Sequence, residues 1–94
     1  LITGNDGFVG RHLVRLLDKK KMPWVGYDLT NGQDIRNVHD LDCVFEKYQI
    51  RYVIHLAACA GIRKSKLYPE RYISTNVFGT QNVVDMCNKY NVEN

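Results

Sequence analysis

The stretch that decides the fold is LITGNDGFVG, residues 1–10. It begins with the apolar run Leu1–Thr3, which predicts the end of a buried strand. Three glycines follow at intervals of three residues, and Val9 then starts an apolar pattern at helical spacing. The stretch therefore predicts a strand, a glycine-rich turn and a helix in immediate succession. The apolar face of that helix is expected to contain Val9, Leu13, Leu16 and Leu17, and Met22-Pro23 is expected to end it.

The rest of the chain alternates between segments with the pattern of a strand and segments with the pattern of a helix. Residues 24–28 and 52–57 predict two further strands, the second of them continuously apolar. Apolar residues from Val38 to Tyr48 predict one helix, and Pro69 suits the first turn of another. This order predicts an α/β fold with a parallel sheet, right-handed crossovers and helices on both faces. One face of the last helix is expected to carry Ile73, Val77, Thr80, Val84 and Cys87.

The three glycines suit the binding of phosphate. Gly4 permits a tight turn, Gly7 lets the backbone approach a pyrophosphate, and Gly10 lets the helix pack against the sheet. The helix N-terminus then offers unpaired amides and a positive dipole end. Asp28 closes the next strand 18 residues after Gly10, where a carboxylate binds the ribose of NAD and repels the 2′-phosphate of NADP. The alternative is that the glycines serve only as turns and Asp28 is a solvated strand end.

The glycine spacing resembles that of the extended short-chain dehydrogenase/reductase family, in its NAD-dependent epimerase/dehydratase branch. Asp-Ile-Arg at 34–36, Val-Ile-His-Leu-Ala-Ala at 53–58 and Asn-Val-x-Gly-Thr-x-Asn at 76–82 are similar to further segments of that family. The resemblance implies that residues 1–94 are a partial NAD(P)-binding domain, the N-terminal half of a Rossmann-type, doubly wound, three-layer α/β/α sheet. It implies that the Asp34 side chain and the following backbone meet the adenine. The cofactor contacts that it implies are Gly4, Gly7, Phe8, Val9, Gly10, Asp28, Asp34, Ile35, Leu56, Ala57, Ala58 and Asn76.

Residues 60–65, with Pro69 and Tyr72, are similar to a segment of nucleotide-sugar 4-epimerases of the UDP-glucuronate and UDP-glucose type. Arg63 is then expected to bind a sugar carboxylate or a pyrophosphate, and a solvated loop position is the equal alternative. Only five residues separate Asp28 from Asp34, a compact form similar to that of GDP-fucose synthases and dTDP-rhamnose-forming reductases, so a third strand is expected to be tiny or missing. Dehydratase, decarboxylase and reductase activities therefore stay open, as does a non-catalytic NAD sensor.

The resemblance implies catalysis by a Tyr whose pKa is lowered by a Lys four residues later. None of the six tyrosines has a Lys at that spacing, so no catalytic residue is expected in this segment, and the segment alone is expected to be inactive. His55 is expected to be a core histidine satisfied by a backbone group. Asn76 is expected to bond to backbone beside the active site, and Gly79 to mark a close helix–strand contact.

The composition of the chain limits its domain count, its partners and its cellular compartment. With 94 residues the chain forms one small core, and the net charge of +3 is too low to favour nucleic acid as a partner. Three widely separated cysteines indicate free thiols in a cytoplasmic protein, and the histidines have no metal-ligand spacing. No membrane span or signal peptide is expected. Both ends are expected to be truncated. The resemblance implies a nucleotide-sugar substrate and a homodimer for the full-length protein.

Overall fold

A short parallel sheet lies at the centre of the computed structural model, which describes residues 1–94 except for the side chain of Ile62. Its strands are β1 (Ile2–Thr3), β2 (Gly26–Tyr27) and β3 (Ile54–His55), in the order β2-β1-β3. Ile2 pairs with Gly26 on one side and with Ile54 on the other. The predicted parallel α/β sheet is confirmed, although β2 and β3 are shorter than predicted.

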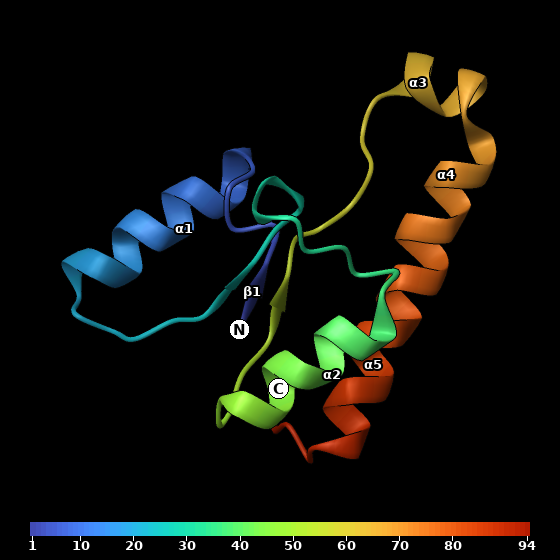
Figure 1. Ribbon diagram of the computed structural model, residues 1–94. Helices are drawn as coiled ribbons and strands as arrows, with labels where there is room; N and C mark the ends of the chain where they lie inside the picture. The colour runs from blue at the N-terminus through green and yellow to red at the C-terminus, as the bar shows by residue number, and fades with distance from the viewer.

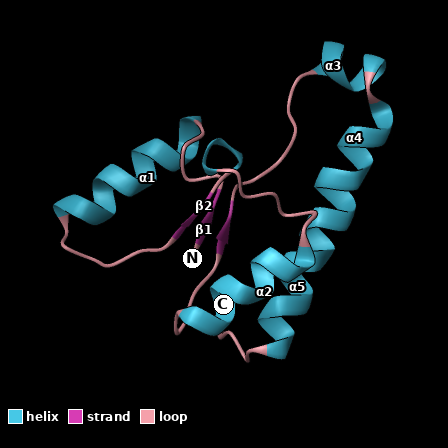
Figure 2. Ribbon diagram, viewed as in Figure 1, coloured by secondary structure: helices cyan, strands magenta, loops and turns pink.

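Helices lie on both sides of the sheet (Figures 1 and 2). α1 (Phe8–Lys19) lies on one side, and α2 (Val38–Lys47) and α5 (Thr80–Lys89) lie on the other. The structure also has two short helices, α3 (Ile62–Leu67) and α4 (Pro69–Ile73), and α4 continues into α5 through the π-helical segment η2 (Ser74–Gly79). Pro69 occupies the first turn of α4, as predicted. In the described residues no helix has both the length and the apolar character that a membrane span requires.

The link between β2 and α2 is compact, as its length predicted. It contains the 3₁₀ helix η1 (Leu29–Asn31) and no strand within the described sheet. Gly32 ends η1 in a left-handed conformation, with φ 72°. The chain therefore passes from β2 directly across the sheet to α2, and brings Asp28 and residues 34–36 to the same edge.

The core lies between the sheet and the α2–α5 pair. It is formed by Tyr27, Ile35, Leu41, Phe45, Val83 and Met86, all of them buried. The opposite face of the sheet is covered by α1 only in part. Ile54 is 41% exposed, and the predicted inner residues Val9 and Leu16 are 59% and 48% exposed. The expectation that helices cover both faces therefore holds fully only on the α2–α5 side.

The face predicted for the last helix meets the core only in part: Thr80 is half-buried and Cys87 packs against the core. Ile73, Val77 and Val84 are exposed, whereas Gly79, Val83 and Met86 are buried. This segment has apolar residues on two faces, so periodicity alone does not select the inner one. The π-helical turn at Ser74–Gly79 also carries an extra residue per turn, so positions before and after it do not follow a single 3.6-residue stripe.

Candidate nucleotide-binding site

A groove of about 280 Å³ opens at the carboxyl ends of the three strands. In open α/β sheets this edge is where ligands bind, because the loops that follow the strands surround it. Eight of the residues predicted to contact a cofactor line the groove: Gly4, Gly7, Asp28, Asp34, Ile35, Leu56, Ala57 and Ala58. The remaining four, Phe8, Val9, Gly10 and Asn76, do not line it.

Gly4 and Gly10 are required by close packing. Gly4 has φ +74°, and a Cβ there would lie 2.8 Å from the Ala57 nitrogen, so the glycine loop packs against the backbone after β3. A Cβ on Gly10 would lie 2.2 Å from the Gly4 carbonyl oxygen. Gly10 therefore fits α1 against the glycine loop itself, which corrects the expectation that it faces the sheet.

Gly7 differs from both. Its backbone is extended, with φ −78° and ψ 179°, a conformation that other residues adopt. A Cβ there would meet only the Gly4 carbonyl oxygen, at 3.3 Å. A Cβ there would therefore need the Gly4 carbonyl oxygen to move by only a few tenths of an ångström, a much smaller change than at Gly4 or Gly10. Gly7 lines the groove immediately before α1, where a side chain would occupy the space that a phosphate needs.

The N-terminus of α1 is suited to an anion. No side chain caps it, and its first turn has no acidic residue. The first amides of a helix have no partner within the helix, and the dipole is positive at this end. Phe8 and Val9 are exposed there and do not line the groove, so the binding role expected of them is left to their backbone amides.

The Asp28 carboxylate joins the glycine loop to η1. Its Oδ2 accepts a hydrogen bond from the Asp6 backbone N–H at 2.8 Å. Its Oδ1 accepts one from the Thr30 backbone N–H and one from the Thr30 hydroxyl, each at 2.9 Å. A carboxylate has about four acceptor sites, so Oδ2 retains room for one further donor such as a ribose hydroxyl. Asp28 is thus fixed in place at the groove before any ligand binds.

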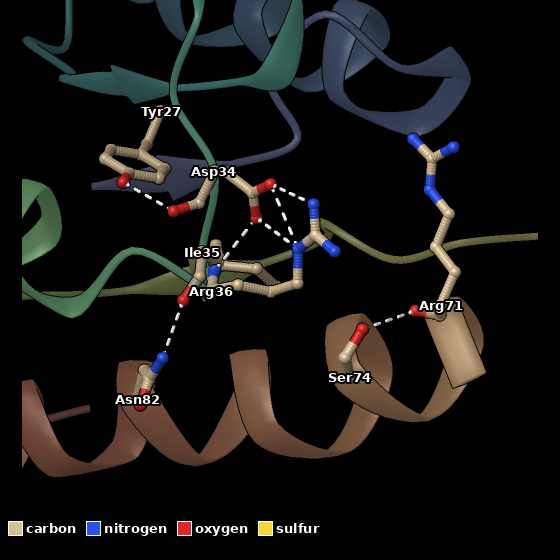
Figure 3. Close-up of polar contacts among 7 residues, drawn as sticks. All are labelled: Tyr27, Asp34, Ile35, Arg36, Arg71, Ser74 and Asn82. Carbon is tan, nitrogen blue, oxygen red and sulfur yellow. Dashed lines mark hydrogen bonds and ion pairs between the residues drawn. The ribbon is translucent and has the colours of Figure 1, made fainter.

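The backbone of residues 34–36 is held from both sides (Figure 3). The Tyr27 hydroxyl donates to the Asp34 carbonyl oxygen at 2.9 Å, and it lies at the same distance from Asp40 Oδ2. Burial, and then the hydrogen bond with Asp40, raise the pKa of Tyr27 well above its usual range. The Asn82 amide donates to the Ile35 carbonyl oxygen at 3.0 Å. This wall of the groove is therefore part of the packed core.

Gly79 explains how η2 approaches that wall. A Cβ on Gly79 would lie 2.6 Å from the Ile35 side chain. The predicted close contact is present, but it is made with the segment that follows η1 and not with a strand. Ile35 is buried as a result, so the groove receives little of its side chain.

His55, in β3, joins β1 to α5. Thr3 Oγ1 accepts hydrogen bonds from the Leu56 and Ala57 backbone N–H groups, at 3.1 and 3.2 Å. With both its lone pairs used, the Thr3 hydroxyl donates its proton to His55 Nδ1, 2.6 Å away. The Nε2–H of His55 then donates to the Thr80 hydroxyl at 2.9 Å.

This pattern assigns His55 as the neutral Nε2–H tautomer. Burial lowers the pKa of the imidazole, which favours the same form. His55 is a structural histidine, as expected, but it is satisfied by two threonine side chains and not by the backbone. Its contacts fix the backbone of Leu56 and Ala57, which line the groove.

Asn76 lies in the π-helical segment and bonds to backbone, as expected. Its Oδ1 accepts from the Cys59 N–H at 2.7 Å, and its Nδ2 donates to the Cys59 carbonyl oxygen at 3.0 Å. Both ends of the amide are therefore used to hold the chain after β3. Asn76 positions the groove and does not line it.

The structure separates the basic residues into two groups. Arg63 is exposed on α3 and does not line the groove. Arg36 and Arg71 do line it, and neither was assigned a role from the sequence. Arg36 belongs to the Asp-Ile-Arg segment, so its motif was a usable signal. Arg71 had none, because its place depends on how α4 packs over the groove.

Comparison with known proteins identifies the family. Residues 1–94 match the family described as "NAD dependent epimerase/dehydratase family". The chain belongs to this family.

Individual relatives agree with that assignment. The chain is 32% identical to Protein CapI of Staphylococcus aureus, matching 100% of the chain and 35% of CapI. It is 31% identical to a UDP-glucuronate 4-epimerase of Thermodesulfobacterium geofontis, matching 99% of the chain and 36% of that protein. The solved UDP-glucose 4-epimerase of Brucella ovis, a complex with NAD, is 32% identical, with a TM-score of 0.86 over 96% of the chain and 32% of that enzyme. The chain thus spans about a third of the length of these relatives.

Proposed function

We propose that this chain is the NAD-binding part of an enzyme that interconverts UDP-sugars differing in configuration at C4. The observation that carries the proposal is Gly7, a glycine that packing requires much less than Gly4 or Gly10, placed in the groove beside an uncapped helix N-terminus. A pyrophosphate at this position explains it. The names of the family and of its relatives support the choice of NAD and of a UDP-sugar.

Each part of the groove has a role in this proposal. The α1 amides and the open space at Gly7 hold the pyrophosphate. Asp28 accepts a ribose hydroxyl at its one free acceptor site and disfavours the 2′-phosphate of NADP. Asp34 and the Ile35 backbone meet the adenine, and Leu56, Ala57 and Ala58 lie along the cofactor. Asn76 and His55 act indirectly, by fixing the backbone after β3.

When bound, NAD would supply the hydride acceptor and donor that a change of configuration at C4 of the sugar requires. The residues of this chain bind and orient the cofactor. The family resemblance implies a Tyr with a Lys four residues later for removal of the C4 hydroxyl proton, and no tyrosine in residues 1–94 has that spacing.

A homodimer is part of the proposal. Ile73, Val77, Phe78 and Val84 are 53%, 58%, 62% and 46% exposed along α4, η2 and α5. Such a row of apolar side chains on one helical segment favours contact with another apolar surface. Sedimentation of the intact protein, with Val77→Asp as the variant, tests this part separately from catalysis.

The test of activity uses the intact protein with UDP-glucuronate and UDP-glucose as separate substrates. Proton NMR distinguishes a C4 epimer from a product that has lost water or carbon dioxide. We expect the C4 epimer from at least one of the two sugars, and no turnover by Gly7→Val. A dehydrated, decarboxylated or net-reduced product would assign the protein to another branch of the family. NAD binding without turnover of either sugar would favour a sensor.

A further inference from the structure

The Asp34 carboxylate is held by one neighbour, Arg36 (Figure 3). Arg36 Nε lies 3.1 Å from Asp34 Oδ1 and 3.0 Å from Oδ2, and Arg36 Nη2 lies 2.6 Å from Oδ2. The Arg36 backbone N–H also donates to Oδ1, at 2.9 Å. Three N–H groups of a single residue therefore bind one carboxylate, which sets both its position and the direction of its plane.

These contacts leave the carboxylate with limited capacity. A carboxylate has about four acceptor sites, and Arg36 supplies three N–H donors. One site therefore stays open for a further donor. The Asp34 side chain is 26% exposed, and Asp34 lines the groove together with Arg36. The open acceptor site therefore lies on a carboxylate that a ligand in the groove can reach.

The charge state of Asp34 limits what it can bind. The hydrogen bond from the Arg36 side chain is the main cause that lowers the pKa of Asp34, and the charge of Arg71 adds to it. An ionised carboxylate accepts hydrogen bonds and donates none. It therefore selects a ligand edge that carries an N–H group over one that carries a carbonyl oxygen.

We propose that Arg36 is a positioning residue that makes the groove select adenine over hypoxanthine, by holding the Asp34 carboxylate in place to accept the adenine 6-amino group. Hypoxanthine has a carbonyl oxygen at the same position, which faces the carboxylate as a second acceptor. The inference deepens the proposed NAD site and rests on it. It assigns to Arg36 a role in base selection that acts only through Asp34.

Arg71 provides the matched control. It lines the same groove and carries the same charge, and it influences Asp34 electrostatically. The structure gives it no hydrogen bond to the Asp34 carboxylate; its backbone carbonyl oxygen accepts from the Ser74 hydroxyl. Loss of Arg71 therefore removes a positive charge from the groove without releasing the carboxylate.

The experiment compares the binding of NAD and of nicotinamide hypoxanthine dinucleotide to the intact protein by calorimetric titration. The parent is expected to prefer NAD by about tenfold or more, since a hydrogen bond to a charged group is involved. Arg36→Met should reduce this ratio to near one, because the carboxylate turns away. Arg71→Met should weaken both dinucleotides by a similar factor and leave the ratio unchanged. If the role of Arg36 were purely structural, Arg36→Met would likewise weaken NAD and nicotinamide hypoxanthine dinucleotide equally and leave their ratio unchanged.

Further variants keep the test decisive. Arg36→Lys retains the charge with fewer donors, so it should give an intermediate ratio, and it replaces Arg36→Met if that variant does not fold. Asp34→Asn should abolish the preference. An unchanged ratio in a folded Arg36 variant, or a parent that binds both dinucleotides equally, would overturn the inference. A parent that binds neither dinucleotide would instead contradict the proposed NAD site.

Discussion

The floor of the groove, residues 3–10 with the ends of β2 and β3, differs from its rim, residues 60–73, in how atoms are held in place. On the floor, backbone packs on backbone: Gly4 lies against the chain after β3, and Gly10 lies against Gly4. On the rim, α3 and α4 are mostly exposed, and Arg63 is not among the residues that line the groove. Close packing admits few residue types, whereas an exposed helix admits many. Motifs are therefore informative about the floor and weak evidence about the rim.

The largest effect that tests this difference in packing is expected within the floor itself. Gly10→Ala places a Cβ 2.2 Å from the Gly4 carbonyl oxygen, so we expect a loss of about 3 kcal/mol or more in the free energy of unfolding. Gly7→Ala meets the same oxygen at 3.3 Å and should cost about 1 kcal/mol or less. Urea denaturation of both variants measures the difference. Equal losses would mean that the two glycines do not differ as described.

Asp28 tests the floor as a binding surface. Asp28→Ala should weaken NAD by about 10- to 100-fold, the cost of a hydrogen bond to a charged group. Asp28→Asn keeps a side-chain acceptor for Thr30 and removes the charge, so it should narrow the preference for NAD over NADP while retaining more of the fold. Calorimetry with each cofactor gives the ratio. A parent that binds NADP as tightly as NAD contradicts the role given to Asp28.

The layer beneath the floor contains His55, and its contribution to the unfolding free energy should depend on pH. Burial lowers the pKa of His55 below its ordinary value of 6.5, so the folded protein disfavours the protonated form. As the pH falls below about 6.5, the unfolded chain binds a proton that the folded chain does not, and the unfolding free energy decreases. Above that pH the contribution is fully present.

Urea denaturation between about pH 5 and pH 8 checks this, with His55→Gln as the control. The variant keeps His12 and His39, so only the part of the pH dependence due to His55 should disappear. If parent and variant lose stability in parallel on acidification, the neutral tautomer assigned to His55 is wrong.

The smallest effect is expected on the rim. Arg63→Ala should raise the KM of the intact enzyme for UDP-glucuronate by about fivefold at most, because an exposed charge contributes little. NAD affinity should be unchanged. Steady-state kinetics against both UDP-sugars checks whether any effect is confined to the acidic sugar. A larger loss would show that the rim closes onto the substrate.

The limits of sequence reasoning follow the same division. Gly4, Gly7, Asp28 and residues 56–58 could be placed in one groove because a parallel sheet with right-handed crossovers follows from the alternation of elements. The roles of Gly10 and Gly79 were only partly foreseen, since each contacts a loop that has no periodicity. The inner face of η2 and α5 was found only in part, at Thr80 and Cys87, because a π-helical turn changes which residues face inward.

Arg71 shows what periodicity and motifs leave out. It lines the groove from α4, an element well separated in the chain from the strand ends and loops that form most of the lining. Paired hydrogen bonds between the Asn76 amide and the Cys59 backbone, 17 residues earlier in the chain, tie the segment that follows α4 to the chain after β3. Long-range contacts of this kind follow from the folded structure and not from local pattern.

The most direct test of the central claim is calorimetric titration of the intact protein with NAD, for the parent and for Gly7→Val. The parent should bind NAD at one site per chain. Gly7→Val should show no binding while its unfolding transition stays close to that of the parent, because packing needs a glycine there much less than the pyrophosphate does. A folded Gly7→Val protein that binds NAD as tightly as the parent would contradict the account.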